Sequence, residues 1–183
     1  MLLTAKDALA VEDSYPGFGD TPASYTLLTP QPMVLNGDFE SWTAGLPDEW
    51  STETGTTFIQ EDNPAYIHGG SWSMGVNVIT MTQGDTDMRQ SVVVEAGVTY
   101  DVSFWAYQTD NRSKVVLYAD GYRAYTDYTI LDAWQENTFS YTASADGSID
   151  VGLRFYDTEN WDAGNPTSLI YIDDFTMTVG VPP

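Results

Sequence analysis

The stretch Thr99–Thr109, TYDVSFWAYQT, alternates between two kinds of side chain and predicts a β-strand. One side of this strand carries Tyr100, Val102, Phe104 and Ala106. Because successive side chains of a strand point to opposite faces of the sheet, that set is expected in the core. The other side carries Trp105 and Tyr107, where a strand facing water would usually carry threonine or charged residues. These two rings therefore form either a platform for a ligand or a surface that another part of the chain covers.

Short stretches of the same kind follow one another along the chain, with turn signals between them. Asn36-Gly37, Asp120-Gly121 and Asp146-Gly147 are dipeptides that favour tight turns. Because no long helical period and no internal repeat occurs, the pattern predicts an all-β sandwich or barrel and argues against a propeller. The expected core consists of Phe39, Met74, Val76, Val78, Val102, Phe104, Val115, Leu117, Phe139, Tyr141, Val151, Leu153, Phe155, Ile172 and Phe175.

Residues 1–32 differ from the rest of the chain in composition and in the lack of a hydrophobic period. Pro16, Gly17, Pro30 and Pro32 interrupt them, and no periodicity extends over more than a few residues. We interpret this stretch as a mostly irregular N-terminal arm or linker. Residues 33–181 then form a single domain.

The charge balance restricts the possible partners. Of the 183 residues, 27 are acidic and 6 are basic, which gives a formal net charge of −21. Nucleic acids and anionic membranes are bound through positively charged surfaces, so we expect neither as a partner. An acidic surface with 12 tyrosines and 6 tryptophans suits divalent cations and neutral polymers instead.

The chain contains no cysteine, so it can form neither disulfides nor zinc–thiolate sites. It has no apolar run of membrane-spanning length, and the residues after Met1 do not form the apolar segment of a cleavable signal. A small β domain without thiols tolerates export. We expect a secreted or cell-surface protein that is a monomer or one module of a larger chain.

Four short motifs, taken in order, resemble a known family. They are NGDFE at 36–40 with Leu46-Pro47 and Trp50, HGGSWSM at 68–74, AGVTYDVSFWA at 96–106, and YIDDF at 171–175. Together they resemble the carbohydrate-binding modules of the family 4, 9 and 22 group. The resemblance implies a jelly-roll sandwich of two antiparallel sheets, commonly with one structural calcium. The same sandwich also serves as an accessory domain in secreted enzymes and adhesins, so the fold alone does not imply sugar binding.

The resemblance places a calcium ion at the edge of the sandwich, between the opening and closing motifs. The candidate ligands are Glu40, Asp174, Asp173, Asp38 and a backbone carbonyl near Ser71. Calcium binds several oxygen atoms, which carboxylates and carbonyls supply. Ile172 and Phe175 are three residues apart, which predicts a β-bulge that turns a carboxylate inward. In so acidic a chain, these carboxylates could also be neighbours by chance.

A second candidate site is a sheet face lined by aromatic side chains. By strand period, the side chains that point away from the core include Trp105, Tyr107, Tyr118, Arg154 and Tyr156. If their three strands share one sheet, as they do in the family, these residues form a single face, with Trp161 at its rim. Aromatic rings stack on sugar rings, while arginine donates to hydroxyl groups. The alternative is that residues 157–167 or the N-terminal arm cover the rings.

Catalytic motifs are absent from the sequence. Neither a G-x-S-x-G motif nor an H-E-x-x-H motif occurs, and His68 is the only histidine. Acid–base catalysis of glycoside hydrolysis needs two carboxylates, and Asp101, Asp150 and Asp157 are available, but their placement shows no acid/base contrast. The expected function is therefore a non-catalytic carbohydrate-binding module that binds a neutral polysaccharide. The alternative is a structural or interaction domain of a larger secreted enzyme or adhesin, which a face filled by the chain itself would favour.

Overall fold

The computed structural model describes residues 33–80, 84–158 and 169–180, so the predicted arm at 1–32 lies outside it. The described part is all-β apart from one 3₁₀ turn, η2 (Pro64–Tyr66). Among the described residues, no helix is long and apolar enough to cross a membrane. The predicted all-β class is confirmed.

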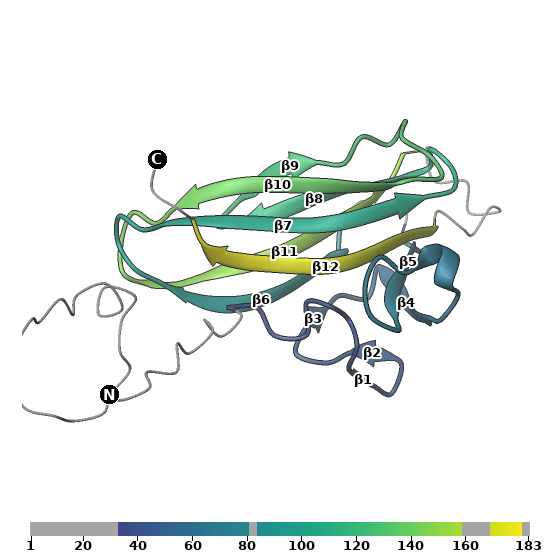
Figure 1. Ribbon diagram of the computed structural model, residues 1–183, viewed down its shortest axis with the longest axis horizontal. Coiled ribbons are helices and arrows are strands. Elements are labelled where there is room, and N and C mark those ends of the chain that lie inside the picture. Colours follow the sequence, from purple (N-terminus) through teal and green to yellow (C-terminus); the bar gives the residue numbers. More distant parts are fainter. Residues whose placement is uncertain (1–32, 81–83, 159–168, 181–183) are drawn as a thin grey trace, which may run out of the picture. The chain divides into compact units, whose positions relative to one another are not determined.

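Two five-stranded antiparallel sheets pack face to face as a sandwich (Figure 1). The first, here called the β7 sheet, has the order β10 (Trp134–Thr142), β7 (Thr99–Gln108), β12 (Leu169–Val179), β5 (Ser73–Val78) and β4 (Thr56–Glu61). The second, the β11 sheet, has the order β3 (Ser51–Thr52), β6 (Asp87–Val94), β11 (Gly147–Asp157), β8 (Ser113–Ala119) and β9 (Tyr122–Tyr125). A small hairpin of β1 (Trp42–Thr43) and β2 (Leu46–Pro47) precedes them.

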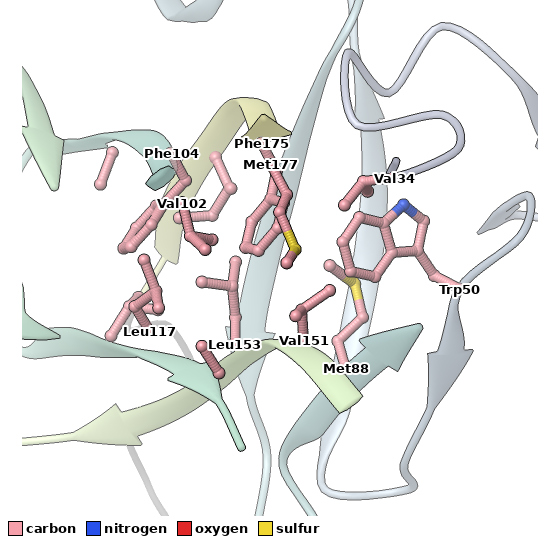
Figure 2. Close-up of a cluster of buried hydrophobic side chains, with 14 of the residues drawn as sticks. Val34, Trp50, Met88, Val102, Phe104, Leu117, Val151, Leu153, Phe175 and Met177 are labelled. Atoms are coloured by element: carbon pink, nitrogen blue, oxygen red, sulfur yellow. The ribbon is translucent and has the colours of Figure 1, made fainter. Parts of the chain in front are cut away.

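The core lies between the inner faces of the two sheets. Figure 2 shows Val102 and Phe104 of β7 and Phe175 and Met177 of β12 facing Leu117 of β8, Val151 and Leu153 of β11 and Met88 of β6. Every predicted core residue is buried except Phe139, which is half-buried and packs against the core. Trp50 also belongs to the core, with its ring 5.7 Å from that of Phe39 and 5.3 Å from that of Phe175. The alternation along β7 therefore has the physical cause that the sequence indicated.

The predicted bulge in the closing strand is confirmed. The pairing of β12 with β7 shifts between Asp173 and Thr176, and Asp174 has a φ of 47°. The opening motif meets this bulge directly, because the amide of Phe175 donates to the carbonyl of Gly37 at 2.7 Å. A Cβ atom at Gly37 would lie only 1.9 Å from the Phe175 carbonyl oxygen, so the contact requires glycine. This close approach brings the acidic residues of the two motifs to one edge of the sandwich.

Candidate functional site

The outer face of the β11 sheet is organised around the carboxylate of Asp87. Asp87 lies directly opposite Arg154 in the strand register and is only 8% exposed. Its carboxylate accepts hydrogen bonds from Nε and Nη2 of Arg154, the latter at 2.8 Å, and from Nη2 of Arg89. Hydrogen bonding to Asp87 raises the pKa of Arg154 above its usual value. One buried carboxylate thus fixes the orientation of two guanidinium groups.

Tyrosine rings lie against these cations. The guanidinium carbon of Arg89 is 3.7 Å from the ring centroid of Tyr118, and that of Arg154 is 4.7 Å from the ring centroid of Tyr122. The Tyr118 and Tyr122 rings meet edge to face at 5.2 Å. Such cation–ring contacts are attractive and hold both groups in place. The result is a rigid layer of rings and hydrogen-bond donors on an open sheet.

A second pair of rings continues the layer. Tyr125 and Tyr156 lie 6.1 Å apart, and the Lys114 ammonium is 5.0 Å and 5.3 Å from their centroids. Tyr122 and Tyr125 remain 42% and 52% exposed, so their rings are open to an external molecule. We call the whole surface the tyrosine–arginine face, made of Arg89, Lys114, Tyr118, Tyr122, Tyr125, Arg154 and Tyr156.

The hydroxyl groups of this face stay protonated at neutral pH. Burial, and to a lesser extent Asp87, raises the pKa of Tyr122. Burial and the hydrogen bond with Tyr125 raise the pKa of Tyr156 to about 12. A hollow of about 460 Å³ adjoins the face at Arg89, on the β3–β6 side of the sheet. It is lined by Leu35, Glu49, Ser51, Arg89, Gln90, Ser91 and Asp150. The face therefore offers both donors and acceptors next to exposed rings.

The outer face of the β7 sheet carries a different group of rings, which the chain itself covers. In the register, Tyr107 lies between Trp134 of β10 and Tyr171 of β12. The ring of Tyr66 stacks on that of Tyr171 at 4.2 Å with 5° between the planes. We call the group the aromatic cluster; its members are Tyr66, His68, Trp105, Tyr107, Trp134 and Tyr171.

His68 covers the tryptophan that the sequence analysis singled out. Its ring stacks on that of Trp105 at 4.0 Å with 17° between the planes, and it meets Trp134 edge to face. The Nδ1 atom of His68 is also 2.6 Å from Oδ2 of Asp174. The aromatic cluster therefore fastens the segment that contains η2 to the outside of the sheet.

The assumption that one sheet carries all the predicted sugar-binding residues is wrong. Trp105 and Tyr107 lie on β7, whereas Tyr118, Arg154 and Tyr156 lie on the other sheet. The two groups consequently sit on opposite outer faces of the sandwich. Trp161 lies outside the described residues. Strand period cannot reveal this split, because it gives the side of a residue but not the sheet to which its strand belongs.

The structure adds five residues that the sequence did not indicate as site residues, namely Asp87, Arg89, Lys114, Tyr122 and Tyr125. Asp87 and Arg89 alternate with the buried Met88 on β6. Tyr122 and Tyr125 belong to β9, which follows the predicted Asp120-Gly121 turn. The period-two pattern of these strands contained the signal, but their partners across the sheet were not evident.

The carboxylates at the sandwich edge converge on the loop 68–72. Oε1 of Glu40 accepts the amides of Ser71 and Trp72 at 2.7 and 2.9 Å. The fully buried Asp173 accepts the amides of His68 and Gly69 on Oδ2, at 2.9 and 3.1 Å. Burial raises the pKa of Asp173 to about 6, against the lowering effect of its backbone hydrogen bonds.

The predicted calcium ligands do not all behave alike. Both oxygens of Asp173 accept backbone amides, because Oδ1 binds the amide of Asp174 at 2.8 Å. Asp38 is exposed. Within the described part of the chain, no group of three or more histidine, cysteine, aspartate or glutamate side chains is placed to hold a metal ion. Any metal here needs backbone carbonyls as well.

Comparison with known proteins identifies the family. A family model described as a carbohydrate binding domain matches residues 31–163. The chain belongs to this family. No protein of curated function matches the sequence of this module.

Solved structures share the fold of the module at low identity. TmCBM61 in complex with β-1,4-galactotriose has a TM-score of 0.60 and 17% identity, over 82% of this chain and 99% of that one. The CBM22-1–GH10 modules of Clostridium thermocellum xylanase 10B, complexed with xylohexaose, have a TM-score of 0.53 and 17% identity. This match covers 82% of this chain and 28% of that one. The CBM22-1 xylan-binding domain of Paenibacillus barcinonensis Xyn10C has a TM-score of 0.52 and 14% identity, over 78% of this chain and 91% of that one. At such identities the likeness shows the β-sandwich.

Proposed function

We propose that the module binds a glycan chain along the tyrosine–arginine face of the β11 sheet. The observation that carries this proposal is the pair of guanidinium groups held by Asp87 and laid against Tyr118 and Tyr122. Sugar rings present apolar C–H faces and polar hydroxyl groups, and this face offers exposed rings beside fixed donors. Because the donors are already oriented, little conformational entropy is lost on binding.

The dimensions of the face suit a chain and not only a single sugar. Its five strands lie side by side at about 4.8 Å, so the sheet is roughly 19 Å wide from β3 to β9. The hollow near β3 and the exposed Tyr125 on β9 lie toward opposite edges of that width. A short oligosaccharide laid across the strands would contact both.

The backbone of the ligand is inferred to be neutral, and the module to be non-catalytic and exported. A net charge of −21 repels a polymer that is charged at every unit. On the face itself, Asp87 offsets one of the two guanidinium charges. Stacking and hydrogen bonding account for binding without a catalytic group. Carbohydrate-binding modules typically occur in extracellular enzymes that degrade polysaccharides, which supports secretion.

A second candidate function has a specific observation in its favour. Tyr66 and His68 cover the rings of the β7 sheet, which is what a structural or interaction domain would show on that side. This observation concerns only the β7 sheet. Because Tyr122 and Tyr125 stay exposed on the β11 sheet, glycan binding remains the better-supported proposal.

Affinity electrophoresis in gels that contain a polysaccharide tests the proposal. We expect retardation in at least one of xylan, β-1,4-galactan, mannan and mixed β-glucan, with no loss of affinity in high salt, because stacking on neutral sugars is not screened. Unretarded migration in all four gels, together with no detectable binding on a wider glycan array, would reject the binding function in favour of the accessory domain.

We further propose that calcium binds at the edge where the opening and closing motifs meet. The residues fit such an ion, because the carboxylates of Glu40 and Asp174 lie against consecutive glycines. A Cβ at Gly70 would come within 2.1 Å of Glu40 Oε1, and one at Gly69 within 2.8 Å of Asp174 Oδ2. Glu40 and Asp174 would hold the ion together with loop carbonyls, and the ion would join the two motifs.

Chelation is expected to destabilise the protein if calcium binds there. An ion that binds only the folded state at a hundred times its dissociation constant adds about 3 kcal/mol to the free energy of unfolding. EDTA should therefore lower the melting temperature, and Glu40→Gln should remove the difference between melts with calcium and with EDTA. Glu136→Gln, on the exposed side of β10, is the matched control and should keep it. Identical melts of the unmodified protein in calcium and in EDTA would refute the site.

A further inference from the structure

Basic side chains are concentrated on one side of the sandwich. The strands of the β11 sheet carry Arg89, Lys114, Arg123 and Arg154, whereas the strands of the β7 sheet carry no lysine or arginine. The β7 strands carry five acidic residues, and the β11 strands carry three. In a chain of net charge −21, the β11 sheet is therefore the side on which a negative group meets the least repulsion.

Lys114 differs from the other cations of the described chain in its contacts. Those others have oxygen acceptors: Asp87 for Arg89 and Arg154, Asp110 for Arg112, and the carbonyls of Ala119 and Asp120 for Arg123. Among the described residues, Lys114 forms no ion pair. Its ammonium lies over the rings of Tyr125 and Tyr156 instead.

This position leaves the ammonium without a carboxylate partner among the described residues, whereas Arg89 and Arg154 share that of Asp87. The two rings shield part of the ammonium from water, and their attraction for a cation is weaker than that of a carboxylate. Lys114 is half-buried, and lysine side chains in such positions commonly pack their alkyl stems while the ammonium reaches water. The exposed ring of Tyr125 beside it would contact the same sugar that reaches the ammonium.

We infer that Lys114 receives a carboxylate substituent of the glycan, so that the preferred ligand is a neutral chain bearing uronic acid groups. This inference rests on the proposed function of the tyrosine–arginine face and specifies its ligand class. A sparsely substituted chain reconciles the local positive charge with the acidic protein. Each isolated carboxylate can pair with Lys114, whereas a polyanion would also meet the repulsion of the whole molecule.

The test compares two forms of the same polysaccharide. Binding is measured by titration calorimetry to glucuronic-acid-substituted xylan and to that xylan after its carboxyl groups have been reduced to alcohols. A uronic-acid-substituted galactan and its reduced form are measured in parallel, so that the result does not depend on one backbone. The proteins are the unmodified chain, Lys114→Met, Lys114→Arg and the control Arg123→Met. Arg123 is exposed, and its guanidinium lies over Phe139 of the other sheet and not on the tyrosine–arginine face, so its replacement changes the net charge equally.

The unmodified protein is expected to bind the acidic form about two- to fivefold more tightly than the reduced form, the range for one accessible ion pair. Lys114→Met should bind the acidic and the reduced form with equal affinity, whatever the level of that affinity. Lys114→Arg and Arg123→Met should keep the preference, and 1 M salt should remove it, because the Debye length is then about 3 Å.

Three results would contradict the inference. Equal binding of both forms by the unmodified protein, or a preference that survives in Lys114→Met, overturns the role of Lys114 and leaves glycan binding standing. Failure to bind any of the four polymers, in a protein that also fails on neutral glycans, overturns the proposed function itself.

Discussion

Trp105→Ala is expected to lower the free energy of unfolding by about 2–3 kcal/mol while glycan binding is retained. Removing a large aromatic side chain from a core costs roughly 3–5 kcal/mol, and Trp105 is only half-buried, so the loss should lie below that range. The substitution removes the surface on which the His68 ring stacks at 4.0 Å. For a domain of this size, the melting temperature should fall by about 4–12 °C.

The measurement is a thermal melt together with affinity electrophoresis in the glycan to which the unmodified protein binds. Trp105→Phe is the matched control, because it keeps an aromatic ring under His68, and it should recover much of the lost stability. Loss of binding by Trp105→Ala at an unchanged melting temperature would contradict the structural role of this ring. Trp105 would then be a sugar platform, and the aromatic cluster would be the functional face.

Tyr122→Ala is expected to have the opposite profile, with binding weakened by about 30-fold or more and the melting temperature nearly unchanged. An aromatic residue that anchors an interface often contributes about 2 kcal/mol or more, which corresponds to that factor. Tyr122 is 42% exposed, so little core surface is lost with it. Its removal also frees the Arg154 guanidinium from the ring that lies 4.7 Å away.

Tyr128→Ala provides the matched control for this prediction. Tyr128 has an almost identical exposure, 43%, but it lies in the connection between β9 and β10 and not on the tyrosine–arginine face. Its replacement should leave both affinity and stability unchanged. Tyr122→Phe tests the hydroxyl separately and should keep most of the stacking energy. If Tyr122→Ala binds as tightly as the unmodified protein, the β11 sheet is not the binding surface.

The contrast between these substitutions separates two surfaces that look alike in sequence. Trp105 and Tyr122 are both aromatic residues on the outer sides of strands. One is covered by a loop from the same chain, and the other is not. Measuring stability and affinity for both variants therefore distinguishes a structural ring from a binding ring.

Local sequence patterns were sufficient for the fold class and most of the core. The alternation in Thr99–Gln108 determines which side chains of β7 are buried, because a strand has a fixed period of two. The three-residue spacing of Ile172 and Phe175 indicated the bulge in β12, because both residues must face the core. The family motifs indicated the sandwich, and the first and last of them meet where Gly37 lies against Phe175.

Only the tertiary structure decided which rings are open. The sequence placed Trp105 and Tyr118 outside the core, but sheet membership depends on pairing between strands far apart in the chain, which no local period encodes. The loop that carries Tyr66 and His68 is distant in sequence from the rings it covers, so its position depends on long-range packing and on the Asp173 and Glu40 hydrogen bonds that anchor it. The sequence thus determined the outward direction of each ring, and the tertiary structure determined whether the chain itself or a ligand lies against it.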